Sequence, residues 1–313
     1  MLPYDPVPWL LDQEGLPAVR ARRILDLSRE SDEETIHALI DDYATVQNID
    51  GSFDGSLMKT AGILNLLSDL GSASAQYILS AGSAYLFSVL QSQSGYERAR
   101  AVAPGSLDTP CDLCGFFGPY AMRSEPSVMA SGAAEMNYYR EYEPLMGPQS
   151  PVRAAPKSSY DRAGPSSCYA WGLIPLSYTI ETLCRAGYAE DARLLPAINA
   201  LLGGQRQSGG WCRNLGGHPL CSPHAIQALG AHPTLRASRS AQRALDFIRG
   251  KLKGKTLFAA LQAVAVFDFP VARVILKEEL DKLASKQKKN GTFGSPCSVE
   301  KVTAVLVARR ALP

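Results

Sequence analysis

The sequence predicts an all-α fold built from pairs of helices, and three observations support this. Its periodic stretches are rich in Ala, Leu, Gln, Arg and Glu, and they place apolar residues at i, i+3 and i+4, as amphipathic helices do. Alternating β-branched residues, which would indicate strands, are scarce. A short pattern also recurs along the chain: a glutamine, then a glycine four residues later and an aromatic residue six residues later.

The first forty residues differ from the rest, and we expect residues 1–40 to form an N-terminal helical cap. Pro8-Trp9-Leu10-Leu11 predicts a short anchored helix, and the apolar spacing over 16–27 predicts a second, amphipathic one. The remainder, 41–313, carries the recurring pattern. We therefore expect residues 41–313 to form the main domain.

Three full copies of the pattern run from Gln47 to Phe53, from Gln205 to Trp211 and from Gln287 to Phe293, and a shortened copy begins at Gln91. The first two starts differ by 44 and the last two by 82, twice 41, so the repeat is about forty residues long, typical of helical pairs. We expect the glycine to end a helix in a left-handed conformation, the glutamine to bond exposed backbone groups, and the aromatic residue to pack against the next helix. Such pairs can stack into an open solenoid or close into a ring.

A long segment between the repeats, at about 124–164, is rich in Pro, Gly and Ser. We expect a loop insert with little helix. A loop of this length in a compact domain is more often functional than idle, although a disordered insert is the alternative.

Composition narrows the classes of partner. The chain has 313 residues and a formal net charge of +2, so there is no basic excess to attract nucleic acid or an anionic membrane. The sequence shows no secretory signal and no window of about 18 uncharged apolar residues that would span a membrane. We expect a cytoplasmic protein.

The seven cysteines are an odd number at low density, which favours free thiols or metal ligands over a disulfide framework. Five of them lie one to four residues after a Pro or Ser and precede an apolar helical stretch: Cys111, Cys114, Cys168, Cys221 and Cys297. If the helical pairs close into a ring, the starts of its inner helices gather at one mouth, where helix dipoles favour thiolate. Cys212 belongs to the turn before that mouth, and His224 shares a helix face with Cys221.

Thiolates combined with an imidazole select zinc, with an iron–sulfur cluster as a lesser alternative. An open coordination position would make the zinc catalytic, and a fully protein-bound zinc would be structural. Any single cysteine can instead pack as a small hydrophobe, which is how we interpret Cys184. The predicted metal ligands are drawn from Cys111, Cys114, Cys168, Cys212, Cys221 and His224.

The glutamine-to-aromatic turn resembles the repeat signature of the α/α toroids, namely squalene and terpene cyclases and the β subunits of protein prenyltransferases. The resemblance favours the closed ring and implies an α/α toroid. The run from Cys168-Tyr169-Ala170-Trp171 to Pro175-Leu176 is similar to one zinc-binding element of the prenyltransferases, and the run from Gly209-Gly210-Trp211 to Pro223-His224 is similar to another. The resemblance thus implies zinc roles for Cys168 and His224, but Ser166 stands where that family has an aspartate.

The resemblance also implies a central cavity for an apolar, isoprenoid-like molecule, and a possible partner subunit. The acidic motifs of both classes of cyclase are absent, and no catalytic residue is identified. We expect either a zinc-dependent transferase or cyclase, or a non-catalytic toroid whose metal site is structural and which binds a partner or ligand. Aromatic residues that would line the cavity, unless they are plain core, are Phe116, Phe117, Tyr120, Tyr169, Trp171 and Trp211.

Overall fold

The computed structural model describes residues 2–91, 173–211, 222–252, 255–293 and 298–313. This part of the chain is helical, and it contains no strand beyond two isolated bridges, which confirms the predicted all-α class. Before the first gap lie α1 (Val7–Leu11), α2 (Leu16–Ile24), α3 (Glu30–Val46), α4 (Leu57–Leu70) and α5 (Gln76–Gln91). After it come α11 (Leu173–Leu183), α12 (Leu195–Gly203), α13 (Ser222–Ala231), α14 (Pro233–Arg236), α15 (Arg239–Ile248), α16 (Lys255–Val264), α17 (Pro270–Ala284) and α18 (Val299–Arg310).

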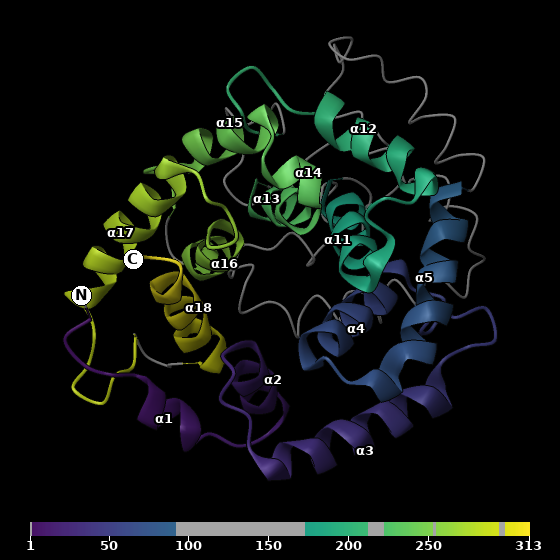
Figure 1. Ribbon diagram of the computed structural model, residues 1–313, viewed down its shortest axis with the longest axis horizontal. Helices are drawn as coiled ribbons and strands as arrows, with labels where there is room; N and C mark the ends of the chain where they lie inside the picture. Colours follow the sequence, from purple (N-terminus) through teal and green to yellow (C-terminus); the bar gives the residue numbers. More distant parts are fainter. Residues whose placement is uncertain (1, 92–172, 212–221, 253–254, 294–297) are drawn as a thin grey trace, which may run out of the picture.

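The described helices form two concentric layers (Figure 1). The inner helices are α2, α4, α11, α13, α16 and α18; each contacts the next, and α18 contacts α2, so the succession of contacts closes on itself. The outer helices are α1, α3, α5, α12, α15 and α17, which surround the inner ones. Most of the hydrophobic core lies between the two layers, where both apolar helix faces are buried.

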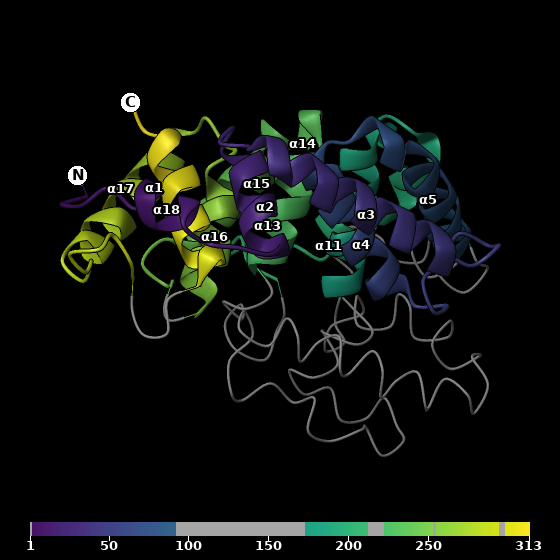
Figure 2. The same ribbon diagram turned by 90° about the horizontal axis from the view of Figure 1, so that it is seen from below.

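The inner helices run in the same direction because the chain alternates between the layers. Each of α2, α4, α11, α13 and α16 is followed in the described chain by an outer helix that returns beside it, as the side view shows (Figure 2). Ser56 caps the start of α4 by accepting a hydrogen bond from the Lys59 amide, and Gly71 ends it in the left-handed conformation. The beginnings of the inner helices therefore share one mouth of the ring, and their ends share the other.

The three full copies of the recurring pattern form the same turn, as predicted. In each, the glutamine Nε2 donates to the carbonyl of the glycine in its own turn, at 2.9 to 3.0 Å. The same Nε2 also donates to a carbonyl in another segment: Ile78 of α5 for Gln47, Ser240 of α15 for Gln205, and Tyr4 for Gln287. The aromatic residues Phe53, Trp211 and Phe293 are buried. Each turn therefore ties one outer helix to the next segment of the outer layer.

The third turn connects the two ends of the chain. The Gln287 side chain donates to the Tyr4 carbonyl and accepts a hydrogen bond from the Tyr4 amide, at 2.8 and 3.1 Å. Arg310, in the last turn of α18, donates to the Leu25 carbonyl at 2.5 Å. The N-terminal segment thus takes the place beside α18 that an outer helix takes in the other pairs. The predicted boundary at residue 40 lies inside α3, and the division into cap and main domain stays a prediction.

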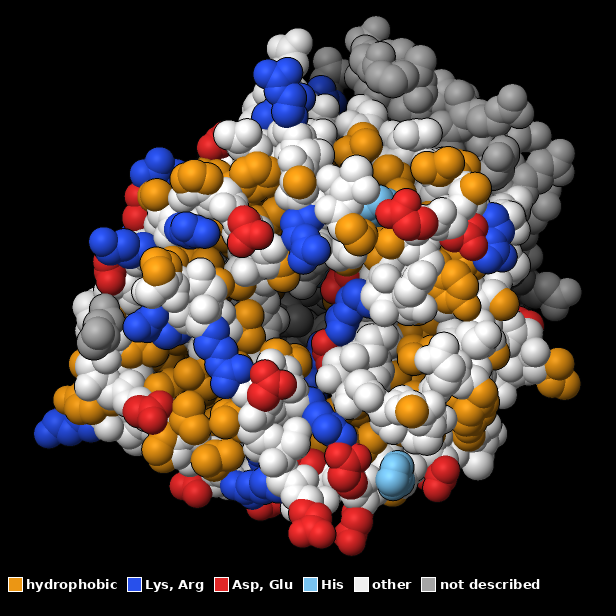
Figure 3. Space-filling model, viewed as in Figure 1, with side chains coloured by type: hydrophobic (Ala, Val, Ile, Leu, Met, Phe, Trp, Pro, Cys, Tyr) orange, Lys and Arg blue, Asp and Glu red, His pale blue; other side chains and the backbone are white. Residues whose placement is uncertain are grey.

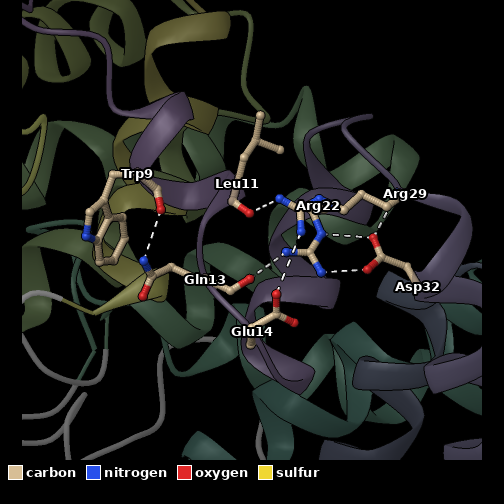
Figure 4. A network of polar contacts seen from close by, with 7 residues as sticks. All are labelled: Trp9, Leu11, Gln13, Glu14, Arg22, Arg29 and Asp32. Carbon is tan, nitrogen blue, oxygen red and sulfur yellow. Dashed lines mark hydrogen bonds and ion pairs between the residues drawn. The ribbon is translucent and has the colours of Figure 1, made fainter.

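A buried ion pair holds α1, α2 and α3 together (Figure 4). Arg22 Nε and Nη2 donate to both oxygens of Asp32, at 2.9 and 2.5 Å, and Arg22 Nη1 donates to the Gln13 carbonyl at 2.9 Å. The Arg29 amide completes the shell of Asp32, and both charged side chains are 2% exposed. The hydrogen bonds from Arg22 hold the pKa of the Asp32 carboxyl below its usual range. This network joins α2 of the inner layer to α3 and to the segment after α1 in the outer layer.

Candidate functional site

The ring of inner helices encloses a hollow, and charged side chains gather around it (Figure 3). An inner helix has neighbours on both sides and an outer helix behind it, so its one open side faces this hollow. Half-buried residues at i, i+3 and i+7 mark that side on two adjacent helices. They are Tyr178, Glu181 and Arg185 along and just after α11, and His224, Gln227 and Ala231 along α13.

His224 is the predicted metal ligand that the structure describes. It lies in the first turn of α13, at the mouth where the inner helices begin, and its ring centre is 5.2 Å from that of Tyr178. Burial lowers the pKa of His224 to about 4, although a hydrogen bond with the Gln227 side chain opposes this, so the imidazole is neutral at physiological pH. Its Nδ1 atom is buried and has no hydrogen-bond partner in the described part of the chain. A neutral imidazole with a free nitrogen is the form that binds a metal ion.

Near the opposite mouth, four charged side chains link three inner helices. Asp69 of α4 pairs with Arg20 of α2 at 2.5 Å and also with Arg185, and Arg185 lies 3.6 Å from Glu181 of α11. Burial raises the pKa of Glu181, although Arg185 opposes this. The two ends of the hollow therefore differ, with neutral ring side chains at one and ion pairs at the other.

The predicted cysteine ligands Cys111, Cys114, Cys168, Cys212 and Cys221 lie outside the described residues, and so does Cys297. In the sequence, Cys221 directly precedes Ser222, the first residue of α13, and Cys212 directly follows the buried Trp211. Within the described ranges, no three His, Cys, Asp or Glu residues cluster closely enough to hold a metal ion. Whether the thiols meet at the mouth beside His224 stays a prediction.

Of the residues predicted to line a cavity, the structure describes Trp211. Its side chain is fully buried, and its Nε1 donates to the Leu201 carbonyl of α12 at 2.8 Å. Trp211 therefore helps to build the core beneath the turn, and its cavity role stays a prediction. Phe116, Phe117, Tyr120, Tyr169 and Trp171 lie outside the described residues, as does the insert at about 124–164. Cys184 is buried in the core as predicted, and burial raises the pKa of its thiol to about 12.

Sequence reasoning missed the polar wall of the hollow between α4 and α11. Asn65 interrupts an apolar run in the middle of α4, and Glu181 is the one charged residue of α11; these interruptions were the available signal. Glu181 also precedes Arg185 by four residues, the spacing of a helical ion pair. A polar residue that interrupts an apolar helix is a candidate for the functional face once the helix is known to be an inner one.

None of the helices in the described ranges is long and apolar enough to cross a bilayer. Comparison with protein-family models, with curated proteins and with solved structures finds no match. The function of the site must therefore be inferred from the residues and geometry of this chain.

Proposed function

We propose that this chain is an α/α toroid of the prenyltransferase and terpene-cyclase type, which binds zinc at the mouth where its inner helices begin. Its central hollow would take an apolar, isoprenoid-like molecule. The closed succession of contacts from α2 round to α18 and back supports the toroid, as do the three equivalent turns between its outer helices.

The observation that carries the zinc proposal is the state of His224. This side chain is neutral at physiological pH, lies at the start of an inner helix and has a buried Nδ1 to which no described residue is hydrogen-bonded. Buried polar atoms of folded proteins are normally hydrogen-bonded, so an unpartnered imidazole nitrogen requires an explanation. A metal ion held together with thiolates such as those of Cys221, Cys212 and Cys168 would provide one.

The donor set fits zinc because thiolates and imidazole are its preferred protein ligands. When bound, zinc would supply the Lewis acidity that lowers the pKa of a coordinated thiol or water. The chain would position this chemistry through α13, which carries His224, and through the turn from Gln205 to Trp211, which precedes it.

The abundance of cysteine supports a second function, a structural zinc site in a non-catalytic toroid. A four-coordinate zinc bound by His224 needs three more ligands, and the chain has more cysteines than that. A zinc bound mostly by thiolates usually has protein ligands at all four positions. The toroid would then bind a partner or a ligand without transforming it. Removing the metal separates the two functions, because loss of a structural zinc lowers thermal stability whereas loss of a catalytic zinc chiefly removes activity.

Metal analysis of untagged protein tests the zinc proposal. We expect about one zinc per chain, lost in His224→Ala and in Cys221→Ser. His37→Ala is the matched control, because His37 is exposed on α3, and it should keep its zinc. Protein that folds and contains no zinc, or a His224 variant that binds zinc as tightly as the wild type, would contradict the proposal.

A further inference from the structure

A second site in the hollow lies between α4 and α11, near the mouth opposite His224. Asp69 and Glu181 are its two carboxylates. They differ in the number of arginines that pair with them and in the distance of the pairing. Asp69 receives both guanidinium groups, from Arg20 at 2.5 Å and from Arg185. Within the described part of the chain, Glu181 is paired only with Arg185, at 3.6 Å, a separation too long for a hydrogen bond. Glu181 is thus the carboxylate that retains the capacity to accept hydrogen bonds.

Asn65 adds an unused acceptor on the side of α4 that faces α11. One turn before Asn65, the Ala61 carbonyl accepts a hydrogen bond from Thr182 of α11 at 3.4 Å; one turn after it, Asp69 pairs with Arg185. Because residues four apart share a helix face, Asn65 faces the segment of α11 that contains Glu181. Its side chain is 6% exposed, and its Oδ1 has no hydrogen-bond partner in the described part of the chain.

The surroundings of these two acceptors select the chemistry of the ligand. A protonated primary amine carries three N–H donors and no acceptor, so it suits a carboxylate and an amide oxygen together. An anionic ligand is disfavoured, because it would have to displace Asp69 from Arg20 and Arg185 and would be repelled by the Glu181 carboxylate. Tyr178, one turn before Glu181, and Leu66, next to Asn65, are half-buried and offer apolar surface for the chain of an alkylamine.

We propose that the wall formed by Asn65 and Glu181 binds the ammonium group of a small primary amine, with its apolar chain lying along the hollow. The positive charge would offset the cost of burying the Glu181 carboxylate, a cost reflected in its raised pKa. A buried water molecule would also satisfy Asn65 Oδ1, but it would add no positive charge beside Glu181, whose contact with Arg185 is long. This site needs no metal and is independent of the zinc proposal.

Calorimetric titration with hexylamine, hexanol and hexanoate at neutral pH tests the site, because the three probes differ in the charge of one end. We expect hexylamine to bind tightest and hexanoate weakest. Glu181→Gln should weaken hexylamine binding by about tenfold or more, the loss of a charge-assisted hydrogen bond. Asn65→Leu should also weaken hexylamine binding without lowering the melting temperature, since it removes an acceptor that has no partner among the described residues.

Glu190→Gln provides the matched control, because Glu190 is exposed nine residues after Glu181 and carries the same change. It should leave hexylamine binding unchanged. The proposal is overturned if hexanol or hexanoate binds as tightly as hexylamine. Unchanged hexylamine affinity in Glu181→Gln would overturn it equally.

Discussion

Two networks of Arg and acidic side chains stand out in the described part of the chain, one buried and complete, the other partly exposed and incomplete. In the network of α1 to α3, Asp32 accepts hydrogen bonds from Arg22 and from the Arg29 amide, and Arg22 has a third acceptor in the Gln13 carbonyl. In the network of α4 and α11, the described residues give Glu181 only a long contact with Arg185, and they give Asn65 Oδ1, on the side of α4 that faces α11, no hydrogen-bond partner. The first network lies between helix layers, whereas the second faces the hollow.

The difference separates a structural role from a functional one. A buried charge is expensive unless hydrogen bonds satisfy it, so a complete network can stabilise the fold and leaves nothing for a ligand. An incomplete network stabilises the fold less and keeps hydrogen-bonding capacity for another molecule. The following variants test whether this distinction holds.

The largest effect is expected from Asp32→Ala, which leaves Arg22 buried without its carboxylate. Removing one partner of a buried ion pair costs about 3–5 kcal/mol of the free energy of unfolding. Urea denaturation measures this cost, with Glu34→Ala at an exposed position of the same helix as the control. A loss below about 1 kcal/mol would show that water reaches Arg22 and that the network is not sealed.

The next largest effect is expected at a glycine of the recurring turn, which we compare with a glycine that lies in open space. Gly209 has a φ of +91°, and a Cβ added there would lie 2.0 Å from the Arg243 carbonyl oxygen. Gly209→Ala should therefore lower the free energy of unfolding by about 2 kcal/mol or more. Gly187, at a φ of +95° with no atom within 4 Å of an added Cβ, is the control and should lose only the conformational cost, about 1 kcal/mol. Equal losses in thermal or urea unfolding would mean that the turn is not tightly packed against α15.

The smallest effect is expected from Glu181→Gln, and its sign is opposite to that of Asp32→Asn. The pKa of Glu181 is raised in the fold, so ionisation costs stability at neutral pH, and the glutamine variant should equal or exceed the wild type there by about 1 kcal/mol or less. The pKa of Asp32 is lowered, so its contribution is present at neutral pH and is lost as the pH falls below about 4.

The free energies of unfolding of the wild type, Glu181→Gln and Asp32→Asn, measured at pH 7 and at pH 3.5, test these opposite signs. The advantage of Glu181→Gln should shrink at the lower pH, and so should the deficit of Asp32→Asn. A clear loss of stability in Glu181→Gln at neutral pH would make both networks structural.

The sequence was sufficient to predict the helices, their pairing and the turns, because these depend on local residues. The glycine at the fifth position of each turn requires a positive φ, and the glutamine reaches a carbonyl only four residues away. The closing contact between Gln287 and Tyr4 depends on residues 283 positions apart, and the sequence did not indicate it. Helix capping by Ser56 and Ser298 likewise follows from local rules.

The candidate site was predicted only in part. His224 was found through a motif, and the structure places it at the start of an inner helix. Glu181 and Asn65 were missed because apolar periodicity identifies the buried faces of a helix and does not reveal which remaining face points to the hollow. That assignment requires the order of the inner helices around the ring, which local spacing does not contain.

X-ray absorption at the zinc edge of the purified, untagged protein tests the central claim most directly, since it reports the atoms bound to the metal. We expect a sulfur shell at about 2.3 Å together with imidazole nitrogen at about 2.0 Å, and the imidazole contribution should disappear in His224→Ala. A metal surrounded only by oxygen, or an imidazole signal that survives the replacement of His224, would contradict the proposed metal site.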